Sequence, residues 1–515
     1  MRPGGYNRRS RPLMNRQRTL LAIVLIYSAA FRLLVMDRPF NYDAEGSGSL
    51  NGVLARSYLR FDWAQNHGMP ILSLDPARGA PAVFYPDHPP MLPLLIVPFY
   101  AAFGVGEWQT RLPISLVTVA AILALYWLLA QFGTPRIGVT AAAVFAATPM
   151  VLYFGGFADV VGTPLIFFVL LAVIGYLRLH RAPGFRSLWT CLGTFALAGI
   201  CDWPAYAIVP IFVVHFVATR PREDWRWIAA FAAGACAWFV AVYSYVTVAT
   251  DYSWTWMADL FSRRSAMVGG HAYTWREWFG AAVSINRTYH TLPLLVASGV
   301  WIAWYGFRRQ RADAGGTVAR LLLAWAAIYS LIGSKALYDH EWAWCLLTPG
   351  LAVATALLLD AAVPGRVTAA VLVLFASWTG YATYGGLYPA RPDRSYTPME
   401  TAQAIRLAAP GSSDVALLVG NDSQAQLWLY GDRPLRSTIW SVDDFQRRLD
   451  DATVDLMFNF DDQPWKARAT GLVFPKAWDV TCAALRVYLI GRYPTVPLPG
   501  ALANHFEVFD LRQPF

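Results

Sequence analysis

Long apolar runs alternate with short polar segments over the first three quarters of the chain. A helix that crosses a bilayer needs roughly 17–25 mostly apolar residues, because lipid offers the backbone no hydrogen-bond partners. The pattern therefore predicts a polytopic α-helical membrane protein with about eleven spans. We place these spans at 18–36, 108–131, 137–154, 161–178, 187–201, 204–219, 226–248, 291–307, 317–333, 343–360 and 366–384.

One further apolar run, Pro90–Gly104, is shorter and contains three prolines. Counting it as a span would reverse the orientation of every later loop. We expect this segment to form a helix that lies in, or dips into, the membrane interface.

The charged residues are few, 15% of 515 positions, and the net charge of +9 is unevenly distributed. With eleven spans and a cytoplasmic N-terminus, six groups of basic residues in the membrane part fall on the cytoplasmic side, as the positive-inside rule requires. The charge therefore indicates orientation in a bacterial inner membrane rather than nucleic-acid binding. These clusters lie at 2–18, 136, 178–186, 220–226, 308–311 and 366.

Three segments are then extracytoplasmic, here periplasmic: a first loop at 38–107, a middle loop at 249–290 and a tail at 385–515. The tail has 13 basic and 15 acidic residues from Pro389 onward, unlike the basic remainder of the chain. We predict two domains, a membrane domain at 1–384 and a small α/β domain at 385–515. Within the tail we expect helices at 401–409 and 442–451, and strands at 416–420, 454–460, 471–475 and 484–491.

Carboxylates gather at the outer face of this topology. Asp43 and Glu45 directly follow the first span, Asp87 and His88 directly precede the interfacial helix, and Asp159 lies in a turn between two spans. Solvated loop residues, or a helix cap in the case of Asp159, are the alternative interpretation. Because two acidic motifs bracket one loop at the same membrane face, we favour a functional site over solvated loop residues.

Cationic and aromatic side chains accompany them. Lys335 is one of three lysines and the only one in the membrane part, and ionisable groups at this depth usually face a cavity or a partner. With His88 and His340 it would supply the donors that hold a phosphate. Interfacial snorkelling is the alternative for Lys335, and a lipid-headgroup anchor is the alternative for a fourth candidate, Arg56. His271 belongs to an aromatic middle loop that either covers the site or forms an interfacial belt.

The order of these motifs resembles the GT-C glycosyltransferases, in particular the branch of protein O-mannosyltransferases and the lipid A aminoarabinose transferase. The most specific match is the His-Pro-Pro step at 88–90 followed by Glu-Trp-x-x-Arg-Leu-Pro at 107–113. Phe157–Asp159 and Tyr338–Pro349 also match, whereas the tail matches weakly.

The resemblance implies a sugar transfer, with inversion, from a polyprenyl-monophosphate donor to a hydroxyl-type acceptor on lipid A or another glycolipid, a polysaccharide or a protein. Asp43 or Glu45 takes the place of the general base, and the intervening Ala44 leaves the choice open. Asp87 and His88 match the step that contacts the lipid phosphate, where relatives carry Lys. Tyr338 and His340 fall in the second matching segment. No cofactor is expected, and a divalent cation is not indicated.

Two other classes of protein remain alternatives. A transporter or lipid flippase usually places its ionisable residues in mid-span, whereas here they cluster at one face. A non-catalytic scaffold of a cell-envelope assembly would need no acidic motif.

Overall fold

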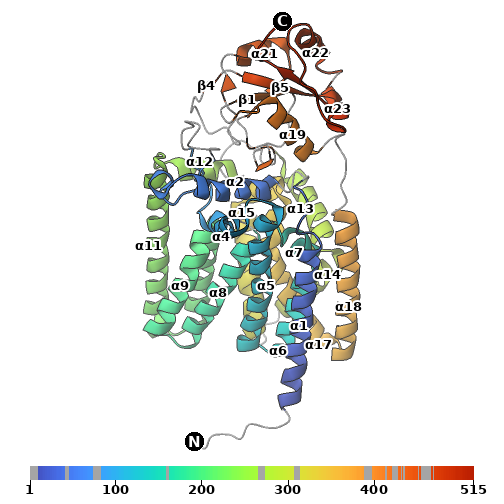
Figure 1. The fold of residues 1–515 in the computed structure, drawn as a ribbon. Helices are drawn as coiled ribbons and strands as arrows, with labels where there is room; N and C mark the ends of the chain where they lie inside the picture. The colour runs from blue at the N-terminus through green and yellow to red at the C-terminus, as the bar shows by residue number, and fades with distance from the viewer. Residues whose placement is uncertain are drawn as a thin grey trace, which may run out of the picture. The chain divides into compact units, whose positions relative to one another are not determined.

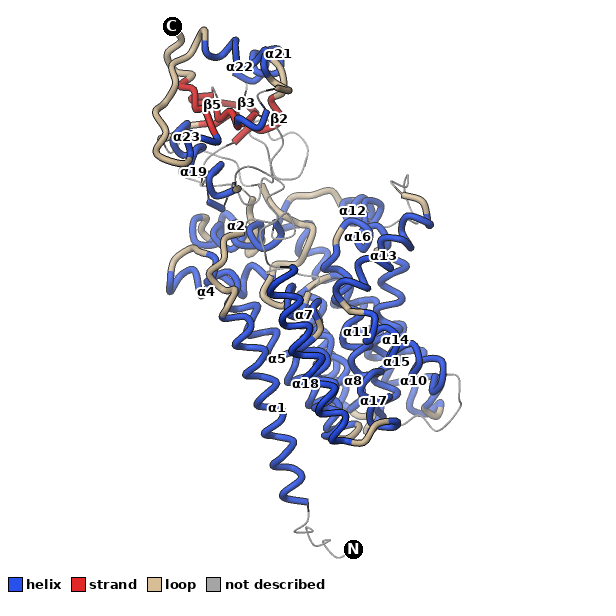
Figure 2. The backbone as a smooth tube through the Cα atoms, turned by 90° about the vertical axis from the view of Figure 1, so that its right-hand side faces the viewer, coloured by secondary structure: helices blue, strands red, loops and turns tan. Residues whose placement is uncertain are grey.

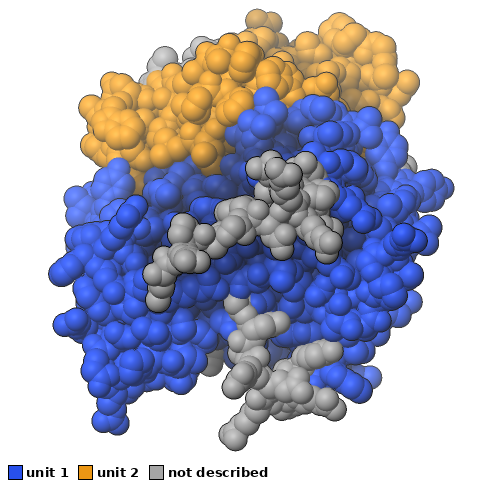
Figure 3. All heavy atoms as spheres, turned by 90° about the horizontal axis from the view of Figure 1, so that it is seen from below, with its two compact units in different colours: residues 1–36, 87–92, 111–389 blue, residues 37–86, 93–110, 390–515 orange. Residues whose placement is uncertain are grey.

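The computed structural model describes residues 10–40, 46–72, 83–157, 162–264, 273–306, 314–387 and 397–515, the last with short gaps at 412–413, 420–426, 428, 431, 433–434, 450–451, 454–465, 468 and 479. The chain divides into two compact units, coloured separately in Figure 3. The first comprises 1–36, 87–92 and 111–389, and the second comprises 37–86, 93–110 and 390–515. The second unit therefore combines the tail with most of the predicted first loop.

The first unit consists of helices (Figure 1), and each of the eleven predicted spans coincides with helical structure. Within the described residues, six helices are long and apolar enough to cross a membrane, so the GT-C-like helical class is confirmed while the count of eleven stays a prediction. The helices are α1 (Ser10–Leu33), α5 (Glu107–Phe132), α6 (Pro135–Ala147), α7 (Pro149–Phe154), α8 (Thr163–Arg181), α9 (Phe185–Cys201), η3 (Trp203–Ala207), α10 (Ile208–Thr219), η4 (Arg222–Asp224), α11 (Trp225–Thr250), α12 (Trp256–Arg264), α13 (Trp275–Tyr289), α14 (Leu292–Trp301), η5 (Ile302–Gly306), α15 (Ala314–Ile332), α16 (Ser334–Asp339), η6 (Glu341–Leu347), α17 (Thr348–Ala362), α18 (Gly365–Ala382) and η7 (Thr383–Leu387).

The predicted span at 137–154 is not one helix. It divides into α6 and α7 at Thr148, whose backbone is extended at φ −67° and ψ 131°. Pro149 follows, and proline both lacks an N–H and disfavours the helical conformation in the residue before it. The local chemistry at this position therefore outweighs the continuous apolar pattern.

The predicted interfacial segment forms α4 (Met91–Phe103), a helix of 13 residues with Pro98 inside it. At a rise of 1.5 Å per residue its length is about 20 Å, short of the ~30 Å hydrocarbon core. Its place in the membrane interface stays a prediction.

Two short helices, α2 (Gly46–Arg60) and α3 (Trp63–Asn66), belong to the second unit. Arg60 forms a two-pronged ion pair with Asp432 at 2.8 and 2.9 Å. The hydroxyl of Tyr430 accepts a hydrogen bond from the Phe40 N–H at 2.7 Å and donates one to Glu107 at 2.9 Å. Glu107 of the Glu-Trp-x-x-Arg-Leu-Pro motif thus holds the tail to first-loop segments.

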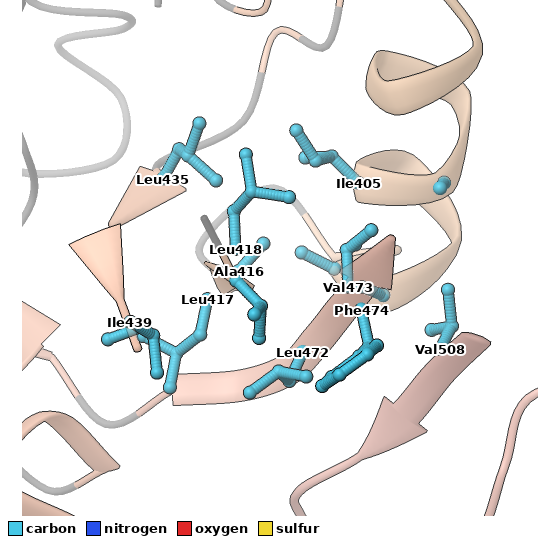
Figure 4. Close-up of a cluster of buried hydrophobic side chains, with 14 of the residues drawn as sticks. Ile405, Ala416, Leu417, Leu418, Leu435, Ile439, Leu472, Val473, Phe474 and Val508 are labelled. Atoms are coloured by element: carbon cyan, nitrogen blue, oxygen red, sulfur yellow. The ribbon is translucent and has the colours of Figure 1, made fainter. Parts of the chain in front are cut away.

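The tail folds as the predicted α/β structure around a four-stranded sheet in the order β2-β1-β5-β6. Strands β2, β1 and β5 are parallel and β6 is antiparallel. Figure 4 shows Ile405 and Val473 among the apolar side chains of this core, and Figure 2 shows the helices around the strands. The elements are α19 (Pro398–Ala408), β1 (Val415–Val419), β2 (Leu435–Ile439), α21 (Val442–Leu449), β3 (Ala452–Thr453), β4 (Lys466–Ala467), β5 (Ala469–Pro475), η8 (Lys476–Trp478), α22 (Ala483–Ile490), α23 (Leu502–His505) and β6 (Phe506–Asp510).

The strand predicted at 484–491 is wrong, because these residues form α22. Leu485 and Leu489 are buried, whereas Val487 between them is 71% exposed. In a strand, residues 485, 487 and 489 would all lie on one face. In a helix, Leu485 and Leu489 share a face because they are four residues apart, and Val487 lies on the opposite face. The strand predicted at 454–460 lies outside the described residues.

The tail core generates a stability prediction. Ile405 on α19 is 1% exposed, and its replacement by Ala should cost about 2–5 kcal/mol through lost packing and the cavity left behind. Leu407 on the same helix is 37% exposed, so Leu407→Ala is the matched control and should cost much less. The rate of limited proteolysis of the tail measures the difference. Equal rates for the two variants would contradict this core.

Candidate functional site

Four of the predicted site residues, Asp43, Glu45, Asp159 and His271, lie outside the described residues. Their predicted functions stay predictions. The remaining six, Arg56, Asp87, His88, Lys335, Tyr338 and His340, are described below.

His88 is held by a carboxylate that is distant in sequence. Its Nδ1 lies 2.8 Å from Oδ1 of Asp202, a residue with no exposed surface at the boundary between α9 and η3. The same oxygen accepts the Trp203 N–H at 2.8 Å. Since a carboxylate oxygen accepts, His88 carries its proton on Nδ1, and Nε2 is the nitrogen on the opposite side of the ring.

Asp87 is tied to the same turn. The Trp203 indole N–H donates to the Asp87 carbonyl at 2.9 Å, and the Asp87 side chain is itself buried. Both residues of the Asp-His step are therefore anchored on η3, one through the main chain and one through the ring. These contacts fix the loop before α4 and hold the imidazole of His88 in one orientation.

Lys335 lies on α16, one turn before Asp339, and its Nζ is 2.6 Å from Asp339 Oδ2. Both side chains are about one-third exposed. Ion pairs this accessible contribute roughly 0–1 kcal/mol, so the ammonium can exchange its partner at little cost.

The middle loop packs against the segment that carries Lys335, Tyr338 and His340. Tyr338 stacks on Tyr273 with ring centroids 4.5 Å apart, and the Trp278 indole N–H donates to the Ser334 carbonyl at 2.7 Å. His340 stacks on Trp342 at 4.6 Å. The structure thus places Lys335, Tyr338 and His340 in one segment that the aromatic residues of the middle loop contact.

Arg56 belongs to the second unit and is 5% exposed. Its guanidinium lies 3.3 Å from Asp432 Oδ1 and donates to the Leu429 carbonyl at 3.2 Å. These contacts give Arg56 a structural function in holding α2 to the tail. Its predicted part in substrate binding stays a prediction.

Asp202 is the residue that sequence reasoning missed. It lies between the predicted spans at 187–201 and 204–219, in a turn that the predicted topology assigns to the outer face. Like Asp159, Asp202 is a carboxylate in a short turn between two predicted spans at the predicted outer face. Its partner, however, is 114 residues away, and only packing shows the pair.

Within the described part of the chain, no three His, Cys, Asp or Glu side chains gather as metal ligands would. The expectation that no cofactor is needed stays a prediction.

Residues 87–243 match the family model described as dolichyl-phosphate-mannose-protein mannosyltransferase. The match includes both His88 and Asp202. ArnT from Cupriavidus metallidurans bound to undecaprenyl phosphate is similar in structure, with a TM-score of 0.61 and 14% identity over 96% of this chain and 97% of that chain. The fold is that of the GT-C glycosyltransferases. The resemblance inferred from the motifs is thereby confirmed.

The apo state of the same ArnT also has the GT-C fold of this chain, with a TM-score of 0.58 and 14% identity over 97% of this chain and 98% of that chain. The Archaeoglobus fulgidus oligosaccharyltransferase tethered to an acceptor peptide reaches a TM-score of 0.50 and 12% identity over 96% of this chain and 74% of that chain. No curated protein matches the chain in sequence. The family model and the GT-C fold together support a membrane glycosyltransferase.

A buried histidine near the matched segment at 338–349 generates a pH prediction. His290, between α13 and α14, donates from Nδ1 to Asn286 Oδ1 and accepts from Thr348 Oγ1 at Nε2, both at 2.8 Å. The Asn286 amide nitrogen donates to the Ala282 carbonyl, which leaves its oxygen as the acceptor for the imidazole. Complete burial lowers the pKa of His290 from 6.5 to about 3.

The folded state therefore keeps His290 neutral, whereas the unfolded chain protonates it below about pH 6.5. The stability that His290 contributes is present above pH 6.5 and lost as the pH falls toward 3, by at most about 1.4 kcal/mol per pH unit. Thermal unfolding in detergent between pH 7.5 and 4.5 measures this loss. His290→Gln should flatten the profile, and His505→Gln, in the tail, should leave it unchanged. A wild-type slope in His290→Gln would show that other groups cause the loss.

Proposed function

We propose that this protein transfers a sugar from a polyprenyl-monophosphate donor to an acceptor at the extracytoplasmic face of a bacterial inner membrane. The observation that carries the proposal is the similarity, over 96% of the chain, to a structure that holds undecaprenyl phosphate. The acceptor is a hydroxyl-bearing glycolipid such as lipid A, a polysaccharide or a protein. The N-terminus is cytoplasmic and the tail periplasmic in this proposal.

The donor phosphate binds His88 and Lys335. The Asp202 carboxylate orients the His88 ring and stabilises a positive charge on it. In this proposal Nε2 donates to a phosphate oxygen. The His88 side chain is 21% exposed, so the ring reaches the surface of its unit. Lys335 supplies a compact ammonium that leaves Asp339 for the phosphate.

The reaction itself needs a base and a stabilised leaving group. Asp43 or Glu45 removes the proton of the acceptor hydroxyl, whose oxygen forms a bond to the anomeric carbon from the face opposite the phosphate. The bond between that carbon and the phosphate oxygen breaks, and its electron pair stays on the polyprenyl phosphate. His88 and Lys335 stabilise the charge that develops there, and the sugar is transferred with inversion.

The base generates the first functional prediction. Purified protein incubated with radiolabelled polyprenyl-phosphate sugars and a membrane extract should label an acceptor, whose identity the product reveals. Asp43→Asn should lower turnover about 10²-fold or more, the usual range for loss of a general base, and Glu45→Gln is the rival substitution. Labelling at wild-type rates in both variants would exclude the first-loop motif as the catalytic centre and favour a transporter or scaffold.

The donor site generates the second functional prediction. Asp202→Asn preserves the hydrogen-bond acceptor but removes the charge, so the affinity for a polyprenyl phosphate should fall about tenfold. Lys335→Ala and His88→Gln should each lower it about 10–100-fold. Fluorescent polyprenyl-phosphate binding measures these affinities. Asp251→Asn, at an exposed position after α11, is the matched control.

Asp202 acts through His88, so the double variant Asp202→Asn/His88→Gln should bind the donor no more weakly than His88→Gln alone. Additive losses would show instead that Asp202 acts independently of His88. Unchanged donor affinity in Lys335→Ala together with poor membrane insertion would make Lys335 an interfacial anchor.

A further inference from the structure

A groove runs along the first unit between α1, α6 and α18, with a cavity volume of about 640 Å³. Helix α6 packs against both α1 and α18. Apart from Thr140 and Thr368, the lining between the ends is aliphatic. Ile23 and Val373 on its sides are 56% and 66% exposed. We call this feature the α1/α6/α18 groove; it opens sideways along apolar helix surfaces.

The two ends of the groove differ in chemistry. At one end the Tyr27 hydroxyl of α1 donates to the Ala376 carbonyl of α18 at 3.0 Å, which closes the space between these helices. At the other end the lining includes three arginines, Arg16, Arg136 and Arg366, one from each helix. The groove is therefore apolar along its length and cationic at its mouth.

The start of α18 reinforces this positive end. A Cβ added at Gly365, the first residue of α18, would lie 3.7 Å from the Arg136 guanidinium carbon, so that guanidinium lies beside the first turn. Helix α6 also begins here, at Pro135, and helix starts present unsatisfied N–H groups and a positive partial charge. Asp360, 2.9 Å from Arg136 Nε, offsets one of the three arginine charges. The mouth retains a net positive charge.

The length of the groove matches one leaflet of a bilayer. The lining extends over residues 16–27 of α1, 136–147 of α6 and 365–377 of α18, so the three helices contribute nearly equal lengths. At 1.5 Å per residue this is about 16 Å, or half of the ~30 Å hydrocarbon core. An acyl chain whose headgroup lies at the arginines would end near the Tyr27 contact.

We propose that the α1/α6/α18 groove binds an anionic phospholipid from the leaflet on the arginine side. Its phosphate contacts Arg16, Arg366 and the start of α18, and one acyl chain lies along the aliphatic walls. Charge complementarity selects this occupant, because basic pockets between membrane helices hold anionic headgroups while the walls exclude a polar ligand. The site does not depend on the proposed sugar transfer.

Native mass spectrometry of the full chain in detergent tests the headgroup. Phosphatidylglycerol and phosphatidylcholine with identical chains are titrated separately, and we expect at least about tenfold tighter binding of phosphatidylglycerol. Arg16→Gln/Arg366→Gln should lower the phosphatidylglycerol affinity about 10–100-fold, the loss of charged hydrogen bonds. Arg18→Gln removes the same charge from exposed α1 outside the groove and should bind as the wild type does.

A second pair of variants tests the acyl chain. Ala143→Trp and Ala369→Phe fill the groove from α6 and α18, and each should abolish the retained lipid while the arginines remain. Four results would overturn the proposal: equal binding of the two lipids, equal loss in Arg18→Gln, competition by inorganic phosphate alone, or a dimer whose formation the groove variants abolish. Because Arg16 and Arg366 are exposed, their replacement leaves the core intact, and the headgroup test stands even if a filled groove unfolds.

Discussion

A carboxylate without any exposed surface must be compensated, and this requirement organises the part of the first unit around His88. Removing an ion from water costs several kcal/mol, and Asp202 has no exposed surface. The His88 ring and the Trp203 N–H supply the compensation at Oδ1, both at 2.8 Å. The loop that carries Asp87 and His88 is held in place as a consequence, and the orientation of the imidazole follows from the needs of the buried charge.

The same rule decides which helices meet elsewhere in the membrane unit. Arg32 of α1 is 2% exposed, and its guanidinium donates to the carbonyls of Ser28 and Val151 at 2.7 and 2.9 Å. Arginine cannot lose its charge, so burial is tolerated only where carbonyl oxygens replace water. Arg32 therefore ties α1 to α7, as His290 ties the end of α13 to the start of α17. Apolar contacts fill the space between helices, and the buried polar groups select the pairs.

Cations that the fold leaves partly exposed lie at the edges of the unit. Arg16 and Arg366 are exposed at the mouth of the α1/α6/α18 groove, where an anionic headgroup can contact them. Lys335 remains in a pair with Asp339 in which both side chains are about one-third exposed. The functional proposals for the donor and for the bound lipid thus both rest on cations that the fold leaves accessible, in contrast to Arg32 and Arg56, which it buries.

The sequence by itself determined the helical membrane class, the positions of its apolar helices and the α/β nature of the tail. These follow from local rules, because lipid requires every backbone group to bond within its own helix and strands alternate with a period of two. It also singled out Asp87 and His88, which are adjacent in the chain. Local rules failed at 484–491, because a mostly apolar run of eight residues is compatible with either a strand or a helix. The burial of Leu485 and the exposure of Val487 show that the run is a helix. Only the tertiary structure brought Asp202 to His88 across 114 residues, because that pairing depends on how α9 and η3 pack and not on any spacing along the chain.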